Sequence, residues 1–182
     1  AYLNPVFFWI RTIVYLTVFI YFAKKFRQKS LLEDQVGGTE IHFWTYKKAA
    51  VFLIFFAVFS STASWDWIMS IDTHWFSTLF GWYVFSGMWV SAIITSILIV
   101  RYLRSLGHLE FLNDSHMHEL GKWMFALSFL WTYLWFSQFL LIWYSNIPEE
   151  VTYFMERIAE FKIPFFGMML VNFIFPMIML MG

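Results

Sequence analysis

Two carboxylates and a histidine lie close together in a stretch that is rich in tryptophan. Asp66, Asp72 and His74 fall within nine residues of SWDWIMSIDTHWFSTLFG, which covers 64–81. Tryptophans flank them, and tryptophan favours the head-group level of a bilayer. Acid and imidazole groups that are half removed from water can have pKa values near neutrality, which suits proton transfer. The alternative is an outer turn whose aspartates cap helix ends and whose histidine has only a structural role.

A second group of titratable side chains lies at the start of a long apolar run, and a polar stripe continues from it. At 100° per residue, the polar or small residues of this run fall within an arc of about 100°. Exposing such a stripe to hydrocarbon would be costly, so we expect it to face protein or water. It serves either proton transfer or hydrogen bonding between helices. The stripe consists of His118, Glu119, Lys122, Ala126, Tyr133, Ser137 and Tyr144, and Gln138 points elsewhere. His116 belongs to the titratable group but not to the stripe.

Composition indicates that lipid surrounds the elements that carry these groups. Of the 182 residues, 60% are hydrophobic and only 13% are charged, which is more apolar surface than a soluble core of this length can hide. Five runs approach the roughly 20 apolar residues that a helix needs to cross a bilayer. We therefore predict one all-helical transmembrane domain, and a piece of a longer protein, with spans at 5–23, 49–67, 77–100, 121–144 and 163–181.

Polar residues within and between the first spans carry further expectations. Arg11 lies inside the first span, where a charge is costly, so it either snorkels to the near interface or pairs with an acid, and we favour snorkelling. The basic connection 24–48 reads as a solvated loop. Segment 113–115 reads as a helix N-cap, with Glu119 in the first turn of that helix.

Two spans carry features of helix packing. Gly87, Ser91 and Thr95 recur at intervals of four, which predicts a notch where two helices approach closely. Pro176 cannot donate to the carbonyl of Asn172, so we expect the last helix to be weakened there. Such a kink is either architectural or the border of a binding cavity.

The distribution of basic residues predicts the orientation. If 24–48 faces the cytoplasm, the tryptophan-rich stretch 64–81 lies on the outer side and His118 on the inner side. The inner residues are then Lys24, Lys25, Arg27, Lys29, Lys47, Lys48, Arg101, Arg104 and Lys122, against Arg157 and Lys162 outside.

Composition also excludes several kinds of chemistry. Without cysteine there is no thiolate iron–sulfur ligation and no catalytic thiol, and a formal charge of zero argues against a nucleic-acid binder. The histidines lie at span ends or in loops, which disfavours a transmembrane haem. His116, His118 and Glu119 match no tight metal site. We expect a helical bundle that binds no metal or cofactor of its own.

Three long blocks carry a resemblance to a known family. They are SWDWIMSIDTHWFSTLFGWYVF, SHMHELGKWMFALSFLWTYLWFSQFLLIWYSNIPEEVTYF and PFFGMMLVNFIFPM. They resemble the membrane subunits of alternative complex III, most closely its F-type subunit, within the NrfD or polysulfide-reductase membrane-subunit family.

The resemblance implies a fold of about ten helices in two bundles, of which this chain would be an inner portion. It implies a bacterial inner-membrane quinol:cytochrome c (or equivalent acceptor) oxidoreductase. Its partners would be a paralogous quinol-binding subunit, an iron–sulfur subunit and haem c subunits, together with lipids. Haem and iron–sulfur clusters would lie in those partners. The proton route suggested for the F-type subunit would touch Asp66, Asp72 and His74 outside and His116, His118, Glu119 and Lys122 inside.

Three roles stay open on the sequence. The leading one is a subunit that provides a proton pathway and a helical scaffold. The second is a subunit that binds quinol itself, with quinol or quinone as substrate and one acid–base cluster receiving its protons. The third is an inert anchor of the complex.

Overall fold

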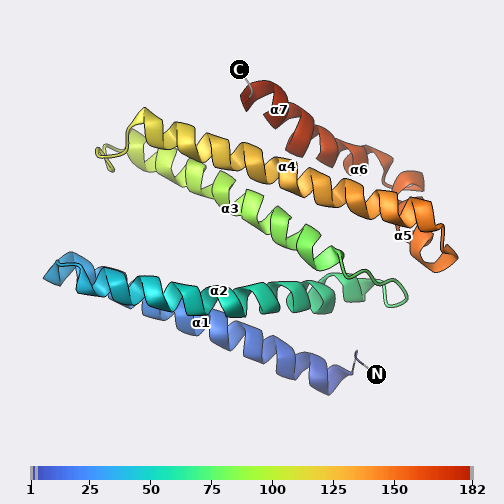
Figure 1. Cartoon of the computed structure of the whole chain (residues 1–182), viewed down its shortest axis with the longest axis horizontal. Helices are drawn as coiled ribbons and strands as arrows, with labels where there is room; N and C mark the ends of the chain where they lie inside the picture. Colours follow the sequence, from blue (N-terminus) through green and yellow to red (C-terminus); the bar gives the residue numbers. More distant parts are fainter. Residues whose placement is uncertain (1, 3, 181–182) are drawn as a thin grey trace. The chain divides into compact units, whose positions relative to one another are not determined.

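The chain is all-helical in the computed structural model, which describes residue 2 and residues 4–180. No strand is present among those residues. Five helical segments are long and apolar enough to cross a membrane, namely Pro5–Val36, Glu40–Ile71, Leu79–Ser105, Asp114–Ser145 and Lys162–Leu180. This confirms the prediction of an all-helical chain with five candidate spans. The chain divides into two compact units, Ala1–Asp72 and Thr73–Gly182 (Figure 1), and their union in a single domain stays a prediction.

The first unit is a hairpin of two long antiparallel helices, α1 (Pro5–Val36) and α2 (Glu40–Trp67), followed by a short 3₁₀ turn, Met69–Ile71. Asn4 caps α1, its side chain accepting a hydrogen bond from the Val6 N–H at 3.0 Å, and Pro5 occupies the first helical turn. The prediction that 24–48 is a solvated loop is wrong, because all but three of these residues are helical. Its lysines and glutamates are good helix formers, and the chain reverses only at Gly37 and Gly38 (φ 69° and 83°).

Phenylalanine rings fill the seam between α1 and α2. The ring of Phe19 lies 6.2 Å from the rings of Phe52, Phe56 and Phe59, and Phe22 lies 5.2 Å from Phe52. Edge and tilted contacts of this kind add about 0.5–1.5 kcal/mol each to simple burial. Because lipid gives no hydrophobic drive between helices, such packing is what holds the hairpin closed within the membrane.

The second unit begins with a second antiparallel hairpin, α3 (Phe80–Ser105) and α4 (Asp114–Ser145), which lie side by side in Figure 1. Gly87 of α3 approaches α4 so closely that an added Cβ would lie 3.3 Å from Nε1 of Trp131. The predicted notch is therefore only partly correct. Ser91 and Thr95 are exposed, and their hydroxyls donate to backbone carbonyls of their own helix, each at 2.8 Å.

Replacing Gly87 with leucine is expected to destabilise the α3–α4 hairpin by about 1–3 kcal/mol, because the indole of Trp131 already fills the space. Thermal unfolding of the purified protein in detergent would measure this loss. The matched control is Ser91→Leu, one turn along the same helix on an exposed position. Equal losses from both variants would show that Gly87 is not the point of closest approach.

The start of α4 follows the expected capping pattern. The Asn113 side chain accepts from the His116 N–H at 3.2 Å, and the His116 ring accepts from the Asn113 N–H at 3.3 Å, which completes a capping box. The prediction that Glu119 lies in the first turn of this helix is wrong, because α4 begins at Asp114 and Asp114 is the acid of its first turn.

An amphipathic helix and an irregular last span complete the second unit. Helix α5 (Pro148–Ala159) joins α4 to α6 (Lys162–Met169), which continues through a π-helical turn, Leu170–Ile174, into α7 (Phe175–Leu180). In this turn the Phe175 N–H bonds the Leu170 carbonyl, five residues back. The turn includes Asn172, the acceptor that Pro176 leaves without its usual bond, so the predicted irregularity is confirmed.

Candidate functional site

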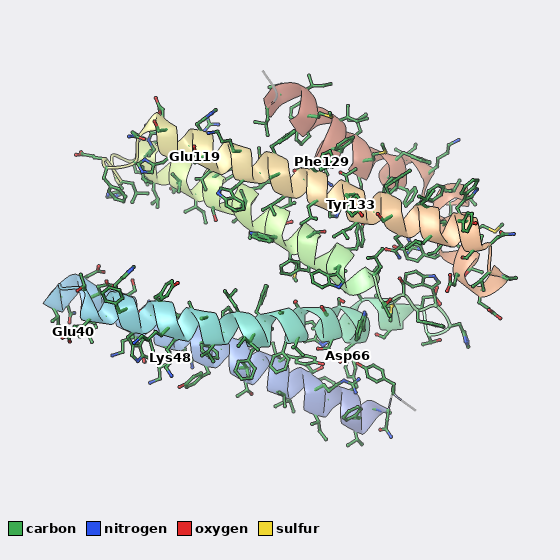
Figure 2. The ribbon with its side chains drawn as sticks, in the orientation of Figure 1. Glu40, Lys48, Asp66, Glu119, Phe129 and Tyr133 are labelled. Atoms are coloured by element: carbon green, nitrogen blue, oxygen red, sulfur yellow. The ribbon has the colours of Figure 1, made fainter. Side chains whose placement is uncertain are left out.

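Asp66 is fully buried at the end of α2 and is held by an arginine from α1. The Arg11 guanidinium donates from Nε to Oδ2 and from Nη2 to Oδ1, both at 2.7 Å. Two parallel, charge-assisted bonds of this length are about twice as strong as neutral hydrogen bonds. The snorkelling that we favoured for Arg11 is wrong, because an acid 55 residues away lies within its reach. Figure 2 places Asp66 where α2 runs beside α1.

Aromatic side chains enclose this ion pair. The Tyr15 hydroxyl donates to Oδ2 of Asp66 at 3.1 Å, and the rings of Tyr2 and Phe7 lie 4.2 and 4.1 Å from the Arg11 guanidinium carbon. Tyr2 precedes the span. Its partial burial and, to a smaller extent, the nearby charge of Asp66 raise the pKa of its phenol to about 12. The pair is thus surrounded by groups that stabilise both charges.

A carboxylate held in this way is poorly suited to carry protons. Protonating Asp66 would remove the counter-charge of the half-buried Arg11 guanidinium and weaken the two short bonds between them. Arg11 already has one buried nitrogen, Nη1, without a hydrogen-bond partner among the described residues. The geometry favours a structural role for Asp66, and its place in a proton pathway stays a prediction.

The other two residues of the opening stretch are accessible. Asp72 follows the 3₁₀ turn, where its N–H donates to the Met69 carbonyl at 3.1 Å, and its side chain is exposed. His74 is exposed as well. Neither side chain makes a hydrogen bond or an ion pair within the part of the chain that the structure describes. Both side chains are accessible to water, and their place in a proton pathway stays a prediction.

The cluster predicted on the inner side is His116, His118, Glu119 and Lys122, and all four residues are exposed. Glu119 and Lys122 form an exposed ion pair at 2.8 Å, one turn apart on α4. His116 belongs to the capping box, and His118 is exposed. Within the described residues, no cluster of three or more histidine, aspartate or glutamate side chains could hold a metal ion.

The stripe on α4 does not face α3. Tyr133 is 61% exposed and lines a cavity of about 300 Å³ beside the C-terminal span, together with Phe129 and Phe173 (Figure 2 labels Tyr133 and Phe129). Ser137 is half-buried. Along α4, Tyr133 lies about 16 Å from Lys122 at 1.5 Å per residue. A proton could cross that separation only through water or through groups outside this chain, and the pathway through Tyr133 and Ser137 stays a prediction.

The face of α4 that packs on α3 carries a polar residue that sequence reasoning missed. Gln138 is 3% exposed, and its Nε2 has no hydrogen-bond partner among the described residues. It follows Trp131 and Trp135 and precedes Ile142 at helical spacing, and all four side chains are buried. This i, i+4, i+7, i+11 spacing was readable from the sequence, but it marks a buried face only once α3 is known to pack there.

Gln138 lines a cavity of about 220 Å³ at the end of the α3–α4 hairpin. The remaining lining comes from the segment before α3, from the last turns of α4 and from the start of α5. These residues are Phe76, Ser77, Thr78, Leu79, Leu141, Ile142 and Glu150.

Comparisons with known proteins leave the family of this chain open. A scan against models of protein families finds no match, and a search of curated proteins finds no similar sequence.

Proposed function

We propose that this chain is a membrane subunit of a quinol:cytochrome c (or equivalent acceptor) oxidoreductase of the alternative complex III type, in a bacterial inner membrane. In this proposal it provides a helical scaffold and part of a proton pathway, within a larger fold of about ten helices. The resemblance of its three long sequence blocks supports the type of complex. Its partners would be a paralogous quinol-binding subunit, an iron–sulfur subunit and haem c subunits, which would carry the redox cofactors.

One observation supports a subunit rather than a self-contained protein. The apolar windows of the five spans are between 6% and 39% buried within the chain, and α6–α7 is the least covered. Single helices need protein contacts to fix their positions in lipid, where association depends on packing rather than on the hydrophobic effect. The uncovered faces, rich in phenylalanine and tryptophan, would pack against the other helices of the complex and against lipid.

The accessible titratable groups define this chain's part in the proposed pathway. Asp72 and His74 would exchange protons at the outer surface, and His118 with the Glu119–Lys122 pair at the inner surface. Helix α4 would conduct protons between these two groups through Tyr133, Ser137 and bound water. Asp66 would hold the α1–α2 hairpin together.

Asp72→Asn tests this role, because the amide keeps the size of the side chain but cannot carry a proton at neutral pH. In vesicles that contain the assembled complex, we expect proton release to fall while quinol oxidation stays within about tenfold of wild type. Losing a positioned base at the reaction itself would typically cost about 10²–10⁴-fold. Steady-state quinol:acceptor turnover and a pH-indicator assay would be measured together.

The same pair of assays separates the three roles. Asp114→Asn is the matched control, because this carboxylate is also exposed but lies outside the proposed pathway. A loss of quinol oxidation beyond about a hundredfold in assembled Asp72→Asn would favour the quinol-binding role instead. No change in either assay would favour an inert anchor.

A further inference from the structure

A half-buried arginine on α5 is held in place by two stacked aromatic rings. The guanidinium carbon of Arg157 lies 3.4 Å from the centroid of the Tyr153 ring, and its Nη1 donates to the Tyr153 carbonyl at 2.7 Å. Trp75 stacks on the same ring at 4.1 Å and donates its indole N–H to the Glu150 carbonyl at 3.2 Å. Both neighbours are so close to Tyr153 that they must occupy opposite faces of its ring. These contacts fix the position of the Arg157 guanidinium.

The charge of Arg157 is not neutralised within the part of the chain that the structure describes. No carboxylate there forms an ion pair with it. Unlike Arg11, Arg157 has no nitrogen that is buried without a hydrogen-bond partner among the described residues. Its guanidinium can therefore still be reached by an anionic group from outside the chain, and it is already oriented to donate to one.

Arg157 lines a cavity of about 400 Å³ between α5 and the first turns of α6, a volume within the usual range of ligand cavities. The neighbouring Glu156 lines the same cavity. The rest of the lining is apolar and consists of Phe161, Pro164, Phe165 and Met168. Most of these side chains are exposed, so a molecule at the surface of the chain can enter the cavity.

The cavity lies at the boundary between an amphipathic helix and a candidate span. Helix α5 joins the end of α4 to the start of α6 (Figure 1). The charged part of the lining comes from α5, and most of the apolar part comes from the span that begins at Lys162. If this span crosses a bilayer, the cavity lies where lipid head groups meet acyl chains.

The two charged side chains narrow the kind of head group. A phosphodiester can accept two parallel hydrogen bonds from the Arg157 guanidinium, and a primary ammonium can donate to the Glu156 carboxylate. Phosphatidylglycerol has the phosphate but no cation for Glu156, and a neutral glycerolipid has no anion for Arg157. Phosphatidylethanolamine supplies both charges on one small head group. Its acyl chains would contact the apolar side chains of α6.

We propose that this cavity binds one molecule of phosphatidylethanolamine. Its phosphate would pair with Arg157, its ammonium with Glu156, and its acyl chains would lie along α6. The apolar window of the last span is only 6% buried within the chain, which leaves room for those chains. The inference does not depend on the proposed function, since it uses none of the residues of the proton pathway.

Arg157→Gln tests the phosphate contact, because the amide keeps polarity but carries no charge. The protein would be extracted in its native membrane assembly and stripped of lipid. Binding of phosphatidylethanolamine and of phosphatidylglycerol with identical acyl chains would then be measured by native mass spectrometry. We expect the affinity of one bound lipid to fall about tenfold or more, as for a lost hydrogen bond to a charged group.

Lys162→Gln is the matched control for this variant. Lys162 is an exposed cation at the start of the same span, but it does not line the cavity. Its loss should leave lipid affinity within about twofold of wild type, because exposed charges outside the contact are screened by solvent and salt. Equal losses in Lys162→Gln and Arg157→Gln would overturn the assignment of Arg157 as the phosphate partner.

Glu156→Gln tests the ammonium contact. The Glu156 side chain is exposed and makes no hydrogen bond or ion pair within the described residues, so this variant should fold normally. The wild type should prefer phosphatidylethanolamine to phosphatidylglycerol by about two- to fivefold, as for an exposed ion pair, and Glu156→Gln should remove the preference.

Three results would overturn the inference. The first is an unchanged affinity for both lipids in Arg157→Gln, as expected if another helix of the assembly fills the cavity. The second is a wild type without the head-group preference, or a preference that survives in Glu156→Gln. The third is displacement of the lipid by glycerophosphoethanolamine at the same concentration as intact lipid, because this compound has the head group without the acyl chains.

Discussion

Replacing Arg11 with methionine is expected to destabilise the α1–α2 hairpin by about 3–5 kcal/mol, the loss typical of a broken buried ion pair. The variant leaves the buried Asp66 carboxylate without its counter-charge, while the Tyr15 hydroxyl still donates to it. Methionine keeps much of the side chain's length, so the loss reports on charge rather than on packing. Unfolding of the purified protein by a denaturing detergent would measure it.

The double variant Arg11→Met with Asp66→Leu is the decisive comparison. Removing both charges should recover much of the lost stability, because no uncompensated buried charge remains. Lys122→Met, which breaks the exposed pair with Glu119, should change stability little. A double variant as unstable as Arg11→Met alone would show that side-chain packing, rather than charge pairing, is what the hairpin needs.

Replacing Trp75 with alanine is expected to cost the second unit about 3–5 kcal/mol, as for other buried aromatic residues. Trp75 is buried, stacks on Tyr153, and contacts the edge of Phe80 at 5.6 Å between ring centroids. These contacts hold α5 against the start of α3. Hydrogen exchange of the α5 amides should rise in the variant, and thermal unfolding would give the overall loss.

Two further tryptophan variants make this prediction specific. Trp75→Phe keeps an aromatic ring but loses the hydrogen bond to the Glu150 carbonyl, so an intermediate loss is expected. Trp82 is 62% exposed at the start of α3, and Trp82→Ala should change stability far less. Similar losses in Trp75→Ala and Trp82→Ala would contradict the anchoring role of Trp75.

The spans were predictable because crossing a bilayer needs only length and apolar composition, which are properties of a local window. The π-helical turn near Asn172 was predictable for a similar reason, since the missing N–H of Pro176 acts within one helical turn. The C-terminal end of α1 and the N-terminal end of α2 were not predictable, because lysine, glutamine and glutamate suit both a solvated helix and a solvated loop. Polarity alone could not distinguish the two.

The contacts that define the sites were harder to predict because they join residues far apart in the chain. The sequence indicated that Arg11 could pair with an acid but not which one, because its partner Asp66 is 55 positions away. The helical projection of α4 correctly grouped its polar residues but could not show which face meets α3. That choice depends on Gly87 and Trp131, whose contact exists only in the folded hairpin. The sequence thus placed Gln138 off the polar stripe, but its burial could not be predicted.

The length of the first hairpin has a mechanical consequence. At 1.5 Å per residue, the 32 residues of α1 reach about 48 Å, against about 30 Å of hydrocarbon. If α1 crosses a bilayer, about three of its turns would extend beyond the hydrocarbon, together with the opening turns of α2 from Glu40 to Lys48 (Figure 2). A slack loop would absorb a push at its tip. Continuous helix is stiffer than a loop, so a displacement of the Gly37–Gly38 turn would move α1 and α2 as rigid rods, with the Arg11–Asp66 ion pair at their opposite end.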